Sequence, residues 1–242
     1  MKFKKIIKLF ILVFFFVATS RNLVQAEIKM DDTRFKLDNV NPTIVRLVSA
    51  DDESRWGTGI VVEPNKILTA AHVLRGLGDI KIYQGEHEDA TRKEFTINSA
   101  KIHPDYKPFE VNKHLHDLAV ITTNENFEDV MVFSHAEYSL MLHPINWIGY
   151  PADLIEQNNN IISQWGTNHR VFNDTDDASN LILTERVTSY QGQSGSGVIN
   201  NAGPNGPRVI GVLSGSGKSA FDTEFTLLRG SNFDFVYDAV YN

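Results

Sequence analysis

Three side chains of this chain have the types and the order that acyl-bond cleavage requires. Ser194 lies within the glycine-rich run GQSGSG, where a tight turn can present its hydroxyl. His72 closes the run TAAH, and Asp117 opens the run DLAV, both upstream of the serine. An imidazole base, a carboxylate and a hydroxyl nucleophile in this chain order are the parts of a catalytic triad. His114 and His116 are close to Asp117 and are interpreted as solvent-facing bystanders.

The elements that would bring these residues together are short strands. From residue 42 onward, runs of β-forming residues alternate with turns, and helical periodicity is almost absent. We expect strands at residues 43–48, 58–62, 66–69, 80–83, 95–102, 118–122, 146–149, 161–165, 181–185, 197–200, 209–213 and 225–228. Two helical exceptions are predicted, one turn at residues 70–74 and a terminal helix at residues 231–241. This pattern predicts an all-β sandwich or barrel.

The first 26 residues have the pattern of a secretory signal peptide. Four lysines within residues 1–8 precede an apolar run at residues 9–17, and small and polar residues then lead to Ala26. A membrane anchor is the alternative, but the run is shorter than the roughly 20 apolar residues that a spanning helix needs. We therefore predict cleavage after Ala26 and secretion. Residues 27–41 are polar without a clear period and are expected to form an N-terminal extension or a pro-segment.

Charge and composition argue against several functions. The leader holds five basic residues and no acid, so its removal changes the formal net charge from −7 to −12. A strongly acidic chain without a Lys/Arg cluster is a poor match for nucleic acid or an anionic membrane. The absence of cysteine excludes disulfides, thiol catalysis and cysteine-ligated zinc. The eight histidines show no HExxH-type spacing, so we expect no metal and no cofactor.

Taken together, the runs resemble those of the chymotrypsin-like (trypsin-like) serine peptidases, and within them the secreted bacterial branch of glutamyl endopeptidases and exfoliative toxins. The resemblance rests on GTGIVV (57–62), ILTAAH (67–72), HPDY (103–106), HDLAVI (116–121), GYP (149–151), GQSGSG (192–197) and IGV (210–212), and it covers about residues 42–240. It implies two six-stranded β-barrels with the active site in the cleft between them. We accordingly expect the first barrel at residues 42–135, the second at 136–230 and a short C-terminal helix at 231–242.

The resemblance also implies a role for each candidate residue. His72 would be the general base, Asp117 would fix its tautomer, and Ser194 would attack a peptide carbonyl to form an acyl-enzyme. The backbone N–H groups of Gly192 and Ser194 would form the oxyanion hole. Glycine suits the first of these positions because a side chain there would restrict the backbone.

Substrate-binding residues are implied on two segments that flank the nucleophile. The side chain before the scissile bond is expected to contact Thr188, Ser189, Tyr190, Leu213, Ser214 and Gly215. Glutamate-specific relatives carry a histidine where this chain has Leu213 and a threonine where it has Ser189, so a neutral or apolar residue is expected instead. Position 188 holds threonine and not an acid, which disfavours a preference for Lys or Arg before the scissile bond. Gln193 replaces the aspartate that pairs with a newly cut N-terminus in trypsin-like animal enzymes, so we do not expect that activation switch.

Two functions stay open, and a third is disfavoured. The first is a secreted bacterial serine endopeptidase, monomeric and acting on protein or peptide substrates. The second is a latent or non-catalytic toxin-like protein that binds a host or surface protein, with a closed oxyanion loop. A carboxylesterase or lipase would require a G-x-S-x-G elbow within alternating strands and helices, and the sequence lacks both.

Overall fold

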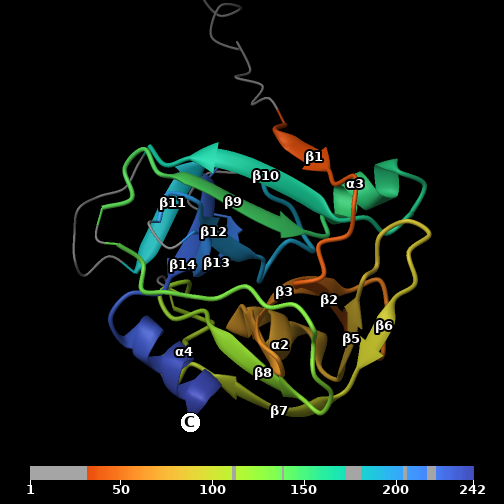
Figure 1. The fold of residues 1–242 in the computed structure, drawn as a ribbon, viewed down its shortest axis with the longest axis horizontal. Helices are drawn as coiled ribbons and strands as arrows, with labels where there is room; N and C mark the ends of the chain where they lie inside the picture. Colours follow the sequence, from red (N-terminus) through yellow and green to blue (C-terminus); the bar gives the residue numbers. More distant parts are fainter. Residues whose placement is uncertain (1–31, 111–112, 138, 173–180, 204–205, 217–221) are drawn as a thin grey trace, which may run out of the picture. The chain divides into compact units, whose positions relative to one another are not determined.

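Two antiparallel sheets and three helices make up the described part of the chain (Figure 1). The computed structural model describes residues 32–110, 113–137, 139–172, 181–203, 206–216 and 222–242. The predicted signal peptide at residues 1–26 lies outside this part. None of the helices in these ranges has the length and apolar character of a membrane span.

The first sheet has seven strands and leads to the candidate histidine and aspartate. Its strands are β2 (Ile44–Ser49), β3 (Trp56–Glu63), β4 (Lys66–Thr69), β5 (Ile80–Gln84), β6 (Lys93–Phe95), β7 (Ile97–Ile102) and β8 (Ala119–Thr123). In space they follow the order β6-β5-β2-β3-β4-β8-β7, with antiparallel neighbours throughout. Every residue of β2 is buried, and its valines and isoleucine suit a pleated, covered surface.

The second sheet also has seven strands and leads to the candidate nucleophile. Its strands are β1 (Arg34–Lys36), β9 (Pro144–Gly149), β10 (Trp165–Arg170), β11 (Ile182–Arg186), β12 (Gly197–Asn200), β13 (Arg208–Ser216) and β14 (Asp222–Leu227). Their order is β1-β10-β9-β12-β13-β14-β11. The pairings of β12 with β13 and of β13 with β14 each contain a register shift. Such bulges increase local twist and help a sheet to curl.

Three short helices complete the described fold. Helix α2 (Ala71–Leu77) follows β4 directly, and α3 (Ala152–Gln157) follows β9. Helix α4 (Ser231–Tyr241) ends the chain and lies beside β7 and β8 of the first sheet (Figure 1). Its buried residues Val236, Ala239 and Val240 belong to the same apolar cluster as Leu118 and Val120. Helix α4 thus packs on the sheet that leads to the candidate histidine and aspartate.

Two apolar clusters fill the interior. The larger one combines residues of the first sheet, such as Ile60 and Leu68, with Ile199 and Val212 of the second. The smaller one lies within the second sheet, where the Trp147 and Phe225 rings have centroids 5.0 Å apart. Because the larger cluster includes residues of both sheets, burial of apolar surface holds the two sheets against each other.

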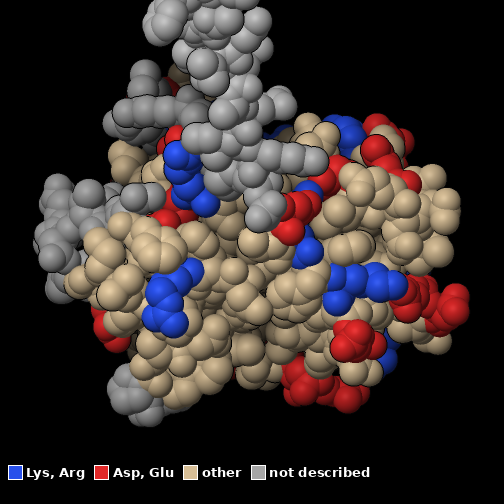
Figure 2. All heavy atoms as spheres, turned by 90° about the horizontal axis from the view of Figure 1, so that it is seen from above, with Lys and Arg blue, Asp and Glu red and all other residues tan. Residues whose placement is uncertain are grey.

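Charged side chains are interspersed on the surface. On the face drawn in Figure 2, Lys and Arg side chains lie beside Asp and Glu, and no continuous basic area forms there. One linked group joins β1 to α3, where Arg34 pairs with Asp32 and with Asp153, each at 2.6 Å. This group anchors the first described strand to the edge of the second sheet.

The all-β chymotrypsin-like class and the C-terminal helix are confirmed, with seven strands in each sheet where six were expected. In the second sheet one strand is β1, which comes from the predicted polar extension. The strand predicted at residues 161–165 is wrong, because β10 begins only at Trp165. The single strand predicted at residues 95–102 forms parts of two strands, β6 and β7, and helix α3 was not predicted.

Candidate active site

Strand pairing brings His72 and Asp117 together. Thr69, the last residue of β4, lies opposite Ala119, the first residue of β8. His72 follows β4 at the second position of α2, and Asp117 precedes β8 by two residues. The register of two neighbouring strands therefore places residues 45 positions apart in the sequence side by side.

The Asp117 carboxylate receives three hydrogen bonds. Its Oδ1 accepts from the backbone N–H of His72 at 2.8 Å, and its Oδ2 lies 2.7 Å from His72 Nδ1. Ser214 Oγ donates a short hydrogen bond to the same Oδ2. An ionised carboxylate only accepts, so Nδ1 of His72 carries the proton, and Nε2 is left with a lone pair.

The pKa of Asp117 lies well below its ordinary value. Burial by itself raises the pKa of this carboxyl, whose side chain is 1% exposed. The neighbouring His114, His72 and Ser214 side chains oppose that effect and prevail. The carboxylate is therefore ionised at neutral pH and can stabilise a positive charge on His72.

Ser194 lies on a turn that only glycine neighbours permit. Gly192 and Gly195 have φ angles of +87° and +85°. A Cβ at Gly195 would lie 2.2 Å from Thr58 O, and one at Gly192 would lie 2.2 Å from Tyr150 O. The turn is fastened to β3, since the backbone N–H of Thr58 donates to Ser194 O at 2.8 Å. The close approach of this turn to the first sheet explains why it is rich in glycine.

The backbone N–H groups of Gly192 and Ser194 have no hydrogen-bond acceptor among the described residues. The preceding carbonyl, Gln191 O, accepts from Ala152 N at 2.9 Å, at the start of α3. In a trans peptide the C=O and the following N–H point in opposite directions. The contact with α3 therefore turns the N–H of Gly192 away from the protein interior around Ala152.

Ser194 and His72 line two common cavities. One, of about 340 Å³, also includes Trp56 and Gly192, and the other, of about 680 Å³, also includes Asp117. No hydrogen bond joins the Ser194 hydroxyl to His72 within the described ranges. In proteins without substrate such bonds are often long. The structure thus brings the three predicted residues to one place.

The cavity beside Ser194 contains most of the predicted substrate-binding residues. It measures about 310 Å³ and is lined by Ser189, Tyr190, Gln191, Ser194, Leu213 and Gly215. Thr188 does not line it, and the Ser214 hydroxyl points instead to Asp117. The Thr223 hydroxyl forms a hydrogen bond with Ser189 Oγ at 2.8 Å and so fixes one wall. Sequence reasoning missed Thr223, because its proximity depends on the sheet and not on any motif.

The two histidines interpreted as solvent-facing are engaged instead, and that interpretation was wrong. The His114 side chain is 13% exposed, and its Nδ1 lies 2.6 Å from Ser214 Oγ. His116 Nδ1 lies 2.8 Å from Asn232 Oδ1. Its ring stacks on His103, with centroids 4.6 Å apart. Gln193 is fully buried, and its Oε1 accepts from Tyr190 N at 3.0 Å, so it braces the turn from inside.

The profile of the trypsin family matches residues 36–226. The chain therefore belongs to the trypsin family, the chymotrypsin-fold serine peptidase family. A venom serine protease of Polistes dominula is 31% identical over 118 residues, which are 44% of this chain and 37% of the wasp protein. The chain thus spans well under half the length of that curated relative.

Solved structures share the fold at low sequence identity. A Glu endopeptidase in complex with MPD superposes with a TM-score of 0.72 at 20% identity, covering 88% of this chain and 98% of the other. The human heparin binding protein gives 0.65 at 15% identity, covering 86% of this chain and 96% of the other. The VesB protease of Vibrio cholerae gives 0.63 at 15% identity, covering 86% and 67%. One of these proteins is named for binding heparin, so the shared fold alone does not establish an activity. The geometry of the site has to support it.

Proposed function

We propose that this chain is a secreted serine endopeptidase that hydrolyses peptide bonds through His72, Asp117 and Ser194. The observation that carries the proposal is the pair of hydrogen bonds from His72 to the buried Asp117 carboxylate, beside Ser194 in shared cavities. A serine hydroxyl is a weak nucleophile, and it needs a base that a third group orients. The site supplies each of these parts.

In the proposed reaction Ser194 Oγ attacks the substrate carbonyl while its proton passes to Nε2 of His72. His72 then gives that proton to the departing amine, which leaves an acyl group on Ser194. A water molecule, deprotonated by His72, releases the acid and restores the serine. Proton transfer by a positioned imidazole contributes about 10²–10⁴ to the rate. Asp117 stabilises the imidazolium that exists between the two transfers.

The N–H groups of Gly192 and Ser194, which have no acceptor among the described residues, support an active form of the protein. Both would donate to the oxyanion that forms when the carbonyl is attacked. A latent protein with a closed loop would need the opposite orientation of the Gln191–Gly192 peptide. The hydrogen bond from Ala152 N to Gln191 O favours the open orientation, so we propose catalysis in preference to the toxin-like binding function.

For the side chain before the scissile bond we propose a neutral or apolar residue. None of the described residues that line the cavity beside Ser194 carries a charge. Leu213 contributes an apolar surface, and the Ser189 and Tyr190 hydroxyls contribute polar atoms. An acidic side chain would lose its hydration there without gaining a counter-charge from these residues. We also propose that the chain belongs to the bacterial glutamyl-endopeptidase branch, that it is secreted and that it is monomeric. The family motifs support the branch, and the signal-peptide pattern of residues 1–26 supports secretion.

The test is hydrolysis of a peptide library by the mature protein and by its Ser194→Ala variant. We expect cleavage after neutral or apolar residues by the parent protein and no cleavage by the variant, with a melting temperature close to that of the parent. Substantial cleavage by Ser194→Ala would overturn the assignment of the nucleophile. Cleavage confined to glutamate would overturn only the specificity.

A further inference from the structure

A second imidazole lies near the Asp117 carboxylate, with His114 Nδ1 3.8 Å from Asp117 Oδ2. His114 Nδ1 lies 2.6 Å from Ser214 Oγ, and Ser214 Oγ donates to Asp117 Oδ2. That same Oδ2 lies 2.7 Å from His72 Nδ1. The carboxylate oxygen that orients His72 is therefore shared with a hydroxyl that His114 contacts.

The proton positions in this chain follow from the donors available. The ionised carboxylate accepts only, so the single proton of the Ser214 hydroxyl points at Asp117. Ser214 Oγ must then accept from His114, which places a proton on Nδ1 of His114. Hydrogen bonds linked in this way strengthen one another. The donor on His114 thus keeps the Ser214 proton directed at the carboxylate.

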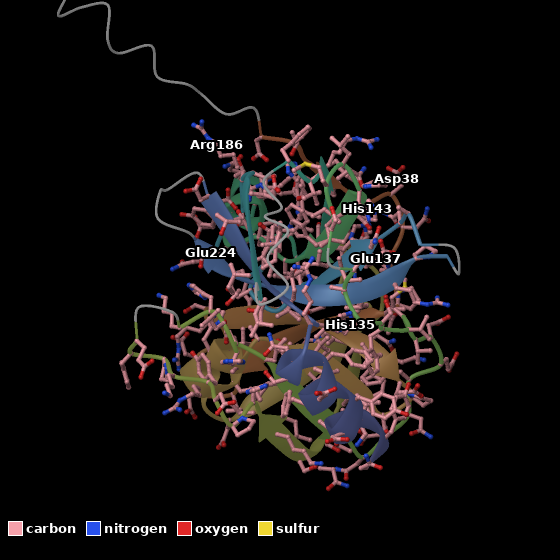
Figure 3. All side chains as sticks on the ribbon, turned by 90° about the vertical axis from the view of Figure 1, so that its left-hand side faces the viewer. Asp38, His135, Glu137, His143, Arg186 and Glu224 are labelled. Carbon is pink, nitrogen blue, oxygen red and sulfur yellow. The ribbon has the colours of Figure 1, made fainter. Side chains whose placement is uncertain are left out.

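His114 is held in place from several directions. Its backbone oxygen accepts from Thr226 Oγ1 on β14 at 2.6 Å, which ties its loop to the second sheet. Its ring lies against Gly215, where a Cβ would be 3.0 Å from His114 Cε1. Its Nε2 lies 3.7 Å from Glu224 Oε2, the residue paired with Gly215 across the sheet. In Figure 3 Glu224 lies well apart from His135, Glu137 and His143, so these three titratable groups are not neighbours of Glu224.

We propose that His114 is a positioning residue of the peptidase site, acting through Ser214 on Asp117. This inference rests on the proposed function. His114 directs the Ser214 hydroxyl to Oδ2, and the hydroxyl in turn fixes the carboxylate against His72. Without His114, the buried Ser214 oxygen loses the group that donates to it, and its hydroxyl is held less firmly against Asp117. Asp117 then holds the His72 imidazolium less well. The loss falls on the transition state, so it lowers kcat more than it changes KM.

The side-chain amides of asparagine and glutamine offer a matched pair of variants. The amide nitrogen of asparagine takes a place close to Nδ1 of histidine, whereas that of glutamine takes a place close to Nε2. For His114→Leu and His114→Gln we expect kcat to fall about tenfold, the effect of one lost hydrogen bond at a charged site. For His114→Asn we expect kcat within about threefold of the parent.

The experiment measures kcat and KM on a cleavable peptide, with active enzyme counted by burst titration so that misfolded protein does not contribute. In a Ser214→Ala background we expect His114→Leu to change kcat by less than about twofold, because the path through the hydroxyl is already absent. A parent-like kcat for His114→Leu, an equal loss for His114→Asn, or additive losses with Ser214→Ala would each overturn the inference. Ser194→Ala is run beside them, and activity remaining in that variant would instead refute the proposed function.

Discussion

Replacing Gly192 by alanine perturbs the proposed oxyanion hole at one atom. Gly192 has φ +87°, and a Cβ there would lie 2.2 Å from Tyr150 O and 2.4 Å from Trp56 Nε1. Those two atoms are themselves hydrogen-bonded at 2.8 Å, so neither can easily withdraw. The backbone of the turn must shift, and the N–H of residue 192 shifts with it.

The magnitude follows from two separate effects. An alanine in the left-handed region costs about 1–2 kcal/mol of folding free energy, which lowers Tm by roughly 2–4 °C per kcal/mol in a chain of this size. Displacing one of two oxyanion donors lowers kcat by about 10²–10³. We therefore expect a folded protein with a modestly lower Tm and a kcat reduced at least a hundredfold.

The assay is peptide hydrolysis normalised by burst titration, with Tm measured by circular dichroism. Gly206→Ala is the matched control, because Gly206 has φ +81° and no atom lies within 4 Å of a Cβ placed there. This control should lose similar backbone stability and keep the parent kcat. If Gly192→Ala keeps kcat within about threefold of the parent, the N–H of residue 192 does not stabilise the oxyanion and the reasoning fails.

Three further results are expected. Asp117→Asn removes the ionised acceptor that fixes the His72 tautomer, so kcat at neutral pH should fall about 10⁴-fold, and a loss below tenfold would contradict that role. The pKa of Asp117 is lowered in the folded protein, so the ionised carboxylate stabilises the fold at pH values above its unfolded pKa of about 4. This stabilisation is lost as the pH falls below about 4. Tm should therefore decline more steeply below pH 4 in the parent than in Asp117→Asn, and parallel curves would refute this. Glu86→Gln leaves the buried Arg46 guanidinium without its carboxylate partner at 2.6 Å, so it should lower the free energy of unfolding, measured in urea, by about 3 kcal/mol. Glu128→Gln removes the acid of an exposed pair and should change this free energy by less than about 1 kcal/mol. Equal effects of the two substitutions would show that burial does not matter here.

The sequence predicted the parts of the site that motifs encode. The runs around His72, Asp117 and Ser194 are local patterns, and the glycines beside the serine report a backbone that a side chain would obstruct. The terminal helix over residues 231–241 was also predicted within its bounds, because apolar spacing is a local signal. Its N-cap is Gly230, and no side chain caps it.

What the sequence could not provide depends on contacts between distant segments. β1 has the polar sequence RFK and forms because its backbone pairs with β10, which no pattern within three residues can reveal. The run at residues 161–165 has strand-like composition, but pairing with β9 begins only at Trp165. His114 looked like a bystander because its partner, Ser214, is 100 positions away. Side-chain orientation at the ends of strands is set by the packed sheets, so it appears only in the structure.

The central claim is that His72 activates Ser194 for attack on a carbonyl, and covalent labelling tests it most directly. The mature protein is treated with a fluorophosphonate probe, digested and mapped by mass spectrometry, in parallel with its His72→Ala variant. The account predicts that Ser194 alone is modified and that the modification disappears in His72→Ala. Absence of labelling in folded protein, labelling of another serine, or labelling of Ser194 that persists without His72 would contradict the account.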